Sequence, residues 1–344
     1  MAWWLLALGV ALLLAVTVDA LATVVSASTR SGPVAERLSH WLWRIARRVA
    51  GDDHSTPLIV AGPVILVTTT VAWISAFWAG WWLIFAADPT AVVDSRSLQP
   101  ADLVGRAYYA AYTVFTLGNG DYSPHGAPWQ LVTAVAVVSG LALVTLVVTY
   151  FIPVVTAVTE RRQLGALVST FGHDASSIVT SAWDGSSFRA FERRVEDLVP
   201  SVLMTAQRHL TYPIIHYFHT TDRGSAFPPS VAALDEAVGM VSAGTDPAVR
   251  PDPVVVRSFR AAVDQLMDIV HTGYEHPEAE PPEIPELAAM RRVGIPTVSD
   301  AAFADALASD RQRRSRLRSY VTQARWSWDR HVVGGGGNWS ALDP

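Results

Sequence analysis

Residues 116–122, TLGNGDY, place two glycines on either side of Asn119. Glycine adopts positive φ without the steric penalty of a Cβ atom, so alternating left- and right-handed residues can turn successive carbonyl oxygens to the same side. Carbonyl oxygens gathered around an axis can replace the hydration shell of a cation, and the Thr116 hydroxyl adds a further oxygen. An ordinary Asn-Gly turn between two helices is the plainer alternative, and the neighbouring segments decide between the two.

The chain as a whole has the composition of a membrane protein. Half of its 344 residues are apolar and its mean hydropathy is +0.25, values that are high for a soluble globular protein. It has no cysteine, which excludes disulfides, thiolate metal sites and cysteine nucleophiles. The small net charge of −5 argues against a nucleic-acid partner. All 26 basic residues are arginine, a bias typical of GC-rich coding sequence and of a bacterial source.

Three apolar stretches exceed the roughly 20 residues that cross a bilayer. They are Trp3–Val25, Pro57–Ala87 and Trp129–Val158, and the first is interrupted only by Asp19 near its end. A signal peptide is the alternative for the first stretch, but the basic start is missing and the apolar run is too long. We therefore predict a first transmembrane helix within residues 1–29.

Arginine placement predicts the orientation of the spans. The loop between the second and third spans is mainly acidic, whereas arginines cluster between the first two spans and directly after the third. The clustered residues are Arg30, Arg37, Arg44, Arg47, Arg48, Arg161 and Arg162. Because cytoplasmic loops carry the excess of positive charge, we expect the N-terminus outside the plasma (inner) membrane and the C-terminal region in the cytoplasm. Residues 30–55 mix tryptophan with arginine, which predicts a basic interfacial linker helix and not a voltage sensor.

The interval between the second and third spans is too long for a hairpin loop. Within it, ADLVGRAYYAAYTVF is apolar and aromatic but only about half the length of a span, which predicts a re-entrant helix over residues 102–115 with Asp102 as its N-cap. This helix leads directly into residues 116–121. Non-helical backbone at membrane depth is tolerated only where protein buries it or where it lines a watery pathway.

The order of these elements resembles the pore module of tetrameric potassium channels. An outer helix (57–87), a short aromatic pore helix (102–115), a Thr-x-Gly-x-Gly-Asp filter (116–121) and an inner helix (128–160) follow one another within residues 56–162. The resemblance implies four copies of the chain around an axis, with K⁺, or Na⁺, held at Thr116, Leu117, Gly118 and Asn119. The carbonyl of Gly120 completes the ion-coordinating set.

The resemblance also assigns supporting roles around the filter. It implies that Tyr108, Tyr109, Tyr112 and Asp121 brace the filter, and that the inner helix bends at Gly140 or Pro153 during gating. Each assignment has an alternative explanation. The tyrosines could belong to an interfacial aromatic belt, Gly140 could serve close helix packing with Ser139 and Ala142 nearby, and Pro153 could mark only the membrane exit.

One position departs from the family pattern. Potassium channels usually carry Tyr or Phe between the two filter glycines, where the ring packs against the pore-helix aromatics, and this chain has Asn119. Asparagine is too small for that packing, and we expect it instead to hydrogen-bond Tyr109 or Tyr112. Related nonselective sodium/potassium channels also have a short polar residue there, so a nonselective cation channel is the alternative to a potassium channel.

Residues 163–344 have an ordinary soluble composition with helical periodicity, and they predict an α-helical cytoplasmic regulatory domain. His209, His216 and His219 invite a metal-site interpretation, but Pro213 interrupts their spacing, and a solvated or core-edge histidine face is favoured. No nucleotide, metalloprotease or hydrolase motif is present, so we expect no enzymatic activity and no cofactor besides permeant K⁺.

The predicted fold is therefore an all-α, tetrameric membrane protein with three transmembrane helices, a re-entrant pore helix with a selectivity-filter loop, and an α-helical cytoplasmic tail. The predicted function is passive conduction of potassium or other monovalent cations across the lipid bilayer by a homotetramer. The expected gating motion is a movement of the inner helix coupled to the tail. A non-conducting membrane sensor or scaffold with a vestigial pore is the alternative from another class.

Overall fold

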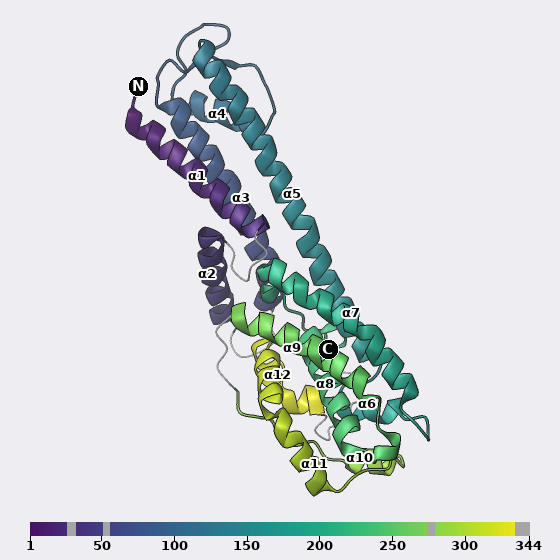
Figure 1. Ribbon diagram of the computed structural model, residues 1–344. Helices are drawn as coiled ribbons and strands as arrows, with labels where there is room; N and C mark the ends of the chain where they lie inside the picture. Colours follow the sequence, from purple (N-terminus) through teal and green to yellow (C-terminus); the bar gives the residue numbers. More distant parts are fainter. Residues whose placement is uncertain (26–31, 51–55, 274–278, 334–344) are drawn as a thin grey trace. The chain divides into compact units, whose positions relative to one another are not determined.

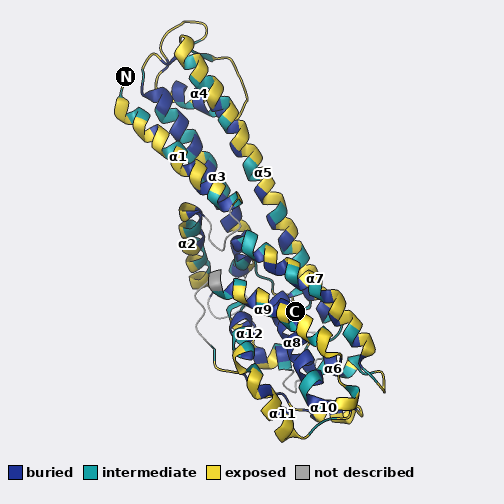
Figure 2. Ribbon diagram, viewed as in Figure 1, coloured by how far each residue is buried: buried dark blue, intermediate teal, exposed yellow. Residues whose placement is uncertain are grey.

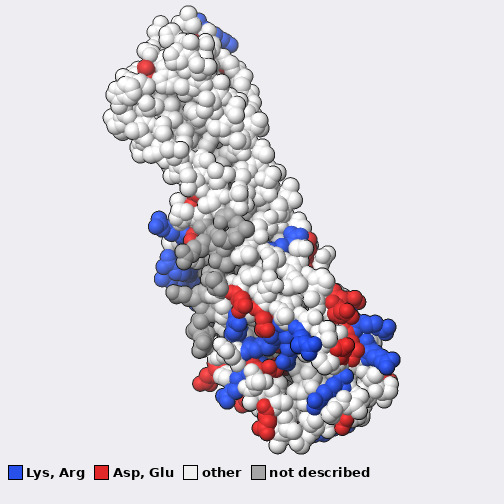
Figure 3. Space-filling model, viewed as in Figure 1, with Lys and Arg blue, Asp and Glu red and all other residues white. Residues whose placement is uncertain are grey.

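A computed structural model describes residues 1–25, 32–50, 56–273 and 279–333 (Figure 1). The chain divides into two compact units. The first, here called the membrane unit, comprises residues 1–45 and 61–155, and the second, here called the tail unit, comprises residues 46–60 and 156–344. In the view of Figure 3, charged side chains gather on the tail unit and over residues 33–50, and the rest of the membrane unit presents a nearly uncharged surface.

Three long helices of the chain are apolar enough to cross a bilayer. They are α1 (Trp3–Val25), α3 (Thr56–Ala86) and α5 (Ala127–Ser169). The prediction of a mainly helical chain with three such helices is confirmed. Helix α5 continues past the predicted residue 160, and Pro153 lies inside the helix without ending it. Of the predicted linker 30–55, residues 33–50 form α2 (Pro33–Ala50), and residues 30–31 and 51–55 lie outside the described part of the chain.

A buried carboxylate joins the first three helices. Asp19 of α1 accepts hydrogen bonds from the indole Nε1 of Trp73 on α3 at 2.8 Å and from the backbone amides of Val34 and Ala35 at 2.7 and 3.2 Å. These amides belong to the first turn of α2, where the helix leaves its N–H groups unpaired and its dipole favours a negative charge. Asp19 is 1% exposed. Asp19, which interrupts the first apolar stretch, is therefore a hydrogen-bonded carboxylate that connects α1, α2 and α3.

Between α3 and α5 lies the short helix α4 (Leu103–Val114). As predicted, Asp102 is its N-cap, and its side chain accepts from the amide of Gly105 at 2.7 Å. The all-α prediction missed a two-stranded antiparallel sheet, β1 (Val92–Asp94) and β2 (Tyr122–Pro124), in which Asp94 faces Tyr122. Strands of three residues are too short to show an alternating pattern in the sequence.

The tail unit is a helical assembly around one buried helix. Helix α8 (Phe227–Gly244) is buried along almost its whole length (Figure 2). Around it lie α6 (Ala175–Ala182), α7 (Arg189–Thr211), α9 (Pro253–Gly273), α10 (Ala288–Arg292), α11 (Asp300–Leu307) and α12 (Arg311–Gln323). The short helices of this unit are η1 (Pro213–Tyr217), η2 (Arg223–Ser225), η3 (Pro247–Val249), η4 (Ala308–Asp310) and η5 (Asp329–Val333). A single apolar core includes residues of the helices α6 to α12 and of η5.

Helix α8 carries two adjacent acidic side chains that would be destabilising without partners. Glu236 pairs with Arg314 of α12 at 2.7 Å, and both side chains are 4% exposed. Asp235 pairs with the neighbouring Arg313. Arg314 also donates to the carbonyl oxygens of Pro282 and Glu283. These ion pairs fix α12 against the central helix.

We expect Arg314→Leu to destabilise the tail unit by about 3–5 kcal/mol, because it leaves the Glu236 carboxylate buried and unpaired. Replacing Glu236 by Leu as well removes that stranded charge and restores part of the loss. Arg316→Leu is the matched control, since Arg316 pairs on the surface with Asp268, whose side chain is 69% exposed, and we expect a change below about 1 kcal/mol. Chemical unfolding of the full-length protein in detergent measures all three; equal effects of Arg314→Leu and Arg316→Leu would contradict the assignment.

Candidate ion-conducting site

The backbone of residues 116–121, here called the TLGNGD segment, alternates in handedness. Thr116, Gly118 and Gly120 have φ values of +58°, +60° and +79°. Leu117 and Asn119 are not among the residues with positive φ. A Cβ atom added at Gly118 or Gly120 would meet no atom within 4 Å in the protomer. Glycine is thus required at these positions by the backbone conformation and not by a lack of space.

Thr116 also helps to cap α4, a role that was not predicted from the sequence. Its amide donates to the carbonyl of Thr113 at 3.1 Å, and the amide of Leu117 donates to the carbonyl of Tyr112 at 2.8 Å. These two bonds, around a residue with positive φ, form the Schellman motif that ends many helices. The first residues of the TLGNGD segment therefore also cap α4, which ties the start of the segment to the end of the helix.

Asn119 is held by a tyrosine of α4, though not by either of the predicted ones. Its side-chain amide donates to the hydroxyl of Tyr108, and that hydroxyl donates to Asp121 at 3.2 Å. The expectation of a bond to Tyr109 or Tyr112 is wrong because both hydroxyls are engaged elsewhere. One small hydroxyl thus links the middle and the end of the segment to α4.

The other two tyrosines hold the surroundings of the segment. The Tyr112 hydroxyl donates to the carbonyl of Tyr122 at 2.6 Å and accepts from the Tyr122 amide at 3.3 Å, so it clamps the chain directly after the segment. The Tyr109 hydroxyl lies 2.6 Å from that of Thr133 on α5. Tyr109 and Tyr112 are 2% and 5% exposed, and Tyr108 is 41% exposed. Hence the side chain of Tyr108 contacts the segment, that of Tyr112 contacts the chain directly after it, and that of Tyr109 contacts α5.

Arg106 is a positioning residue that sequence reasoning missed. Its buried guanidinium donates to the carbonyl of Ala86, the last residue of α3, at 3.1 Å, and to the carbonyl of Ala101 at 3.1 Å. The last carbonyls of a helix lack partners within the helix, and a guanidinium is a suitable donor for them. Arg106 therefore joins the end of α3 to the start of α4. Only its position inside an otherwise apolar stretch hinted at this role.

A hollow of about 370 Å³ lies behind the TLGNGD segment. Its lining comes from the segment, from α4, from β2 and from α5, and comprises Tyr109, Tyr112, Thr113, Thr116, Gly118, Gly120, Tyr122, Pro124, Thr133 and Val137. The two glycines contribute no side chain to this space, and Asn119 does not line it. The segment is therefore supported by hydrogen bonds at a few points and not by packed side chains.

Gly140 allows α5 to approach the end of α4. A Cβ atom at this position would overlap the carbonyl group of Val114, the last residue of α4. The structure thus gives Gly140 a packing role next to the TLGNGD segment. Pro153 lies lower on α5, two residues before the boundary between the two units at residues 155 and 156. The bending of α5 at either residue stays a prediction.

Downstream of Pro153, α5 is anchored within the tail unit. Arg161 is buried and donates to the carbonyls of Ile215, at 3.1 Å, and Phe218. Glu160 pairs with Arg208 of α7 at 2.7 Å. In the sequence, Arg161 indicated only which side of the membrane is cytoplasmic. In the structure its guanidinium lies inside the tail unit and joins α5 to the segment around η1.

The three tail histidines form no metal centre. Among the described residues, no group of three or more His, Cys, Asp or Glu side chains lies close enough to hold a metal ion. His209 and His216 contact each other edge to face at 6.3 Å between ring centroids. Burial lowers the pKa of His219 to about 4, so this ring is neutral at pH 7. The three rings belong to the core edge of the tail unit.

Comparisons with known proteins agree with the arrangement of helices. Residues 64–157 match a family model described as "Ion channel", a range that contains α4, the TLGNGD segment and most of α3. A curated protein of Bacillus subtilis (strain 168), printed as "Uncharacterized membrane protein YdjJ", is 35% identical over 320 residues, which cover 93% of this chain and 94% of the relative. No solved structure matches the chain.

We expect Gly140→Ala to reduce both the stability of the membrane unit and ion flux, because the methyl group pushes the end of α4 away from α5. Overpacking of this kind costs about 1–3 kcal/mol. The adjacent Ser139→Ala is the matched control, since the Ser139 hydroxyl donates to the carbonyl of Ala136 in its own helix. Thermal unfolding and liposome flux are measured together; changed flux with an unchanged unfolding temperature would instead support a hinge without a packing role.

Proposed function

The chain belongs to the same family as the membrane protein YdjJ of Bacillus subtilis, and from that premise and its ion channel domain we propose that it forms the pore of a cation channel. The ion channel domain supports passive ion conduction across a membrane. Our proposal is more specific: four copies surround an axis, and the TLGNGD segment of each copy supplies carbonyl oxygens to permeant K⁺. The coordinating residues would be Thr116, Leu117, Gly118, Asn119 and Gly120.

One observation carries this proposal. Positive φ recurs at every second residue from Thr116 to Gly120, directly after a short helix that lies in sequence between two membrane-spanning helices. An Asn-Gly turn would need positive φ only at one or two neighbouring residues. Regular alternation over five residues instead turns successive carbonyls to one side, which suits a row of cation sites.

The need for several copies follows from exposure. Residues 115–121 are all exposed in the single chain, and non-helical backbone cannot face lipid. Further copies of the chain around a water-filled axis would shield this backbone from lipid and let it line a path for ions. A four-fold arrangement is what the resemblance to tetrameric potassium channels implies.

The tail unit would act as the regulatory part of the channel. Because Arg161 and Glu160 fix the lower part of α5 to the tail unit, a change in the tail would pull on α5 below Pro153. We further propose that α4 re-enters the membrane without crossing it, that the N-terminus faces outward, and that the tail unit is cytoplasmic at the plasma membrane. The arginines that cluster on α2 and after α5 support this orientation.

A nonselective cation channel is the second candidate, and Asn119 favours it. The contact of Asn119 with Tyr108 is a hydrogen bond to an exposed ring, which restrains the segment less than an aromatic ring packed among others. Discrimination between K⁺ and Na⁺ depends on how firmly the coordinating carbonyls are held. A looser segment would therefore pass both ions.

We expect Gly118→Ala to abolish K⁺ flux into liposomes that contain the purified protein. An L-residue at φ +60° is strained by about 1–2 kcal/mol, and relief of this strain would turn a carbonyl away from the axis. Gly126→Ala is the matched control, because Gly126 also has positive φ, +79°, but lies outside the segment. Flux that survives Gly118→Ala, or is lost equally in both variants, would contradict the proposal and favour a non-conducting scaffold.

We expect Asn119→Tyr to raise the permeability ratio of K⁺ to Na⁺, because a tyrosine ring can pack against the aromatic side chains of α4 and stiffen the segment. Liposome flux with K⁺ and then Na⁺ gradients measures the ratio for both proteins. Tyr108→Phe is the companion variant, since it removes the hydrogen bonds to Asn119 and Asp121 without adding a ring, and we expect it to lower the ratio. Equal permeation of both ions by the unmodified protein would establish the nonselective channel.

A further inference from the structure

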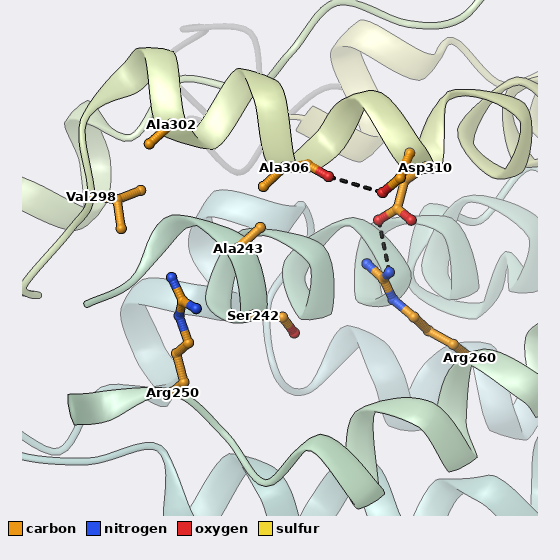
Figure 4. Close-up of a pocket in the computed structure, with 9 residues that line it drawn as sticks. Ser242, Ala243, Arg250, Arg260, Val298, Ala302, Ala306 and Asp310 are labelled. Atoms are coloured by element: carbon orange, nitrogen blue, oxygen red, sulfur yellow. Dashed lines mark hydrogen bonds and ion pairs between the residues drawn. The ribbon is translucent and has the colours of Figure 1, made fainter. Parts of the chain in front are cut away.

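The tail unit contains a cavity of about 240 Å³ that is open to solvent, since none of its lining residues is buried, and that has no part in the proposed pore. Helices α8, α9, α11 and η4 surround it (Figure 4). The lining residues are Ser242, Ala243, Arg250, Arg260, Val298, Ala302, Ala306, Ser309 and Asp310. All of them belong to the tail unit, so the cavity is defined without reference to the membrane unit.

Arg250 brings an unpaired positive charge to this cavity. Its Nε donates to the carbonyl of Thr245 at 3.1 Å, which fixes the base of the guanidinium group. Among the residues that the structure describes, no carboxylate pairs with Arg250 within 4 Å. The two terminal nitrogens extend toward Val298 on the far side of the cavity (Figure 4). Arg250 is exposed, so these two donors are accessible to a bidentate acceptor.

Arg260 lies on the side of the cavity opposite Arg250, and one of its hydrogen-bond donors is unused within the described residues. Its Nη1 pairs with Asp310 at 2.7 Å, while its Nε is buried without a hydrogen bond in the described part of the chain. Gly239 makes room for this side chain, since a Cβ atom there would lie 3.3 Å from the Arg260 Nη2. An unsatisfied buried donor costs about 1–3 kcal/mol, which an acceptor in the cavity could offset.

The remaining walls are small and apolar. Ala243, Ala302, Ala306 and Val298 contribute the apolar part of the lining. The two hydroxyls are already used within their own helical segments, because Ser242 donates to the carbonyl of Val238 and Ser309 to that of Ala306. The cavity therefore presents two positive charges, one negative charge and an apolar wall.

We propose that this cavity binds a small organic anion. Its carboxylate or phosphate group would lie between Arg250 and Arg260, whose planar guanidinium groups suit such acceptors. Its short apolar body would lie against Ala302, Ala306 and Val298. The volume is below the roughly 300–1,000 Å³ of pockets for drug-sized ligands, which points to a small carboxylate or phosphate ester and not to a dinucleotide.

Asp310 gives the proposal a distinctive consequence. Its carboxylate occupies Arg260 in the empty cavity, so an incoming anion competes with it and is repelled by it. Removing the Arg250 charge should weaken anion binding, and removing the Asp310 charge should strengthen it. A purely structural role of these residues does not predict effects of opposite sign.

The test uses the full-length protein in detergent, titrated with inorganic phosphate, butyrate and benzoate at constant ionic strength set with chloride, since surface charges are screened by salt. Benzamide serves as the uncharged counterpart of benzoate. We expect at least one anion to bind in calorimetry and to raise the unfolding temperature, and benzamide to do neither. We expect Arg250→Gln to weaken this binding by about tenfold or more and Asp310→Asn to strengthen it by about threefold.

Arg257→Gln is the matched control, because Arg257 is, like Arg250, an exposed arginine, and it lies on α9 without lining the cavity. Ala306→Leu is a second test that leaves both arginines in place: it fills the cavity from an exposed position and should abolish binding. The proposal is overturned if none of the anions binds the unmodified protein, or if Arg257→Gln weakens binding as much as Arg250→Gln. Binding unchanged in Ala306→Leu would also overturn it.

Discussion

Backbone groups outside a helix need protein or water as partners wherever lipid surrounds the chain, and this constraint organises the membrane unit. Within the described residues, the TLGNGD segment makes backbone hydrogen bonds at its two ends, to α4 through Thr116 and Leu117 and to Ser95 through the Asp121 carbonyl. The middle depends on side chains. Helix α4 provides them, and it can do so because Arg106 and Asp102 fix its start.

The two ends of α4 are fixed in different ways. At the start, the Asp102 carboxylate caps the helix, and the Arg106 guanidinium joins it to α3. At the end, Thr116 adopts a left-handed conformation that glycine would adopt with less strain. A threonine at this position gives up some stability of the cap and keeps the hydroxyl that we propose as an ion ligand. A site built in this way accepts local strain where the proposed chemistry needs an oxygen.

Much of this arrangement could be predicted from the sequence, because its features are local. Apolar length specified the three long helices, and Asp102 marked the start of α4. The partner of Asn119 could not be predicted, because Tyr108 and Tyr109 differ by one position on a helix, and only the packing of Tyr109 against α5 decides which hydroxyl is free for the segment. The cavity in the tail unit was also beyond prediction, since Arg250 and Asp310 are far apart in the chain.

All basic residues of the chain are arginines, and in both units some of them are buried and bond the backbone of other segments. Arg106, Arg161 and Arg314 are buried, and each donates to backbone carbonyl oxygens of a segment other than its own helix. A guanidinium has five donors in a planar group and stays charged when buried, whereas a lysine has a single ammonium and loses its charge more readily. Lysine could not join α3 to α4 and also bond the loop before α4, as Arg106 does. The arginines of this chain therefore act as junctions between segments, and the cavity is unusual because Arg250 offers its terminal donors to no segment that the structure describes.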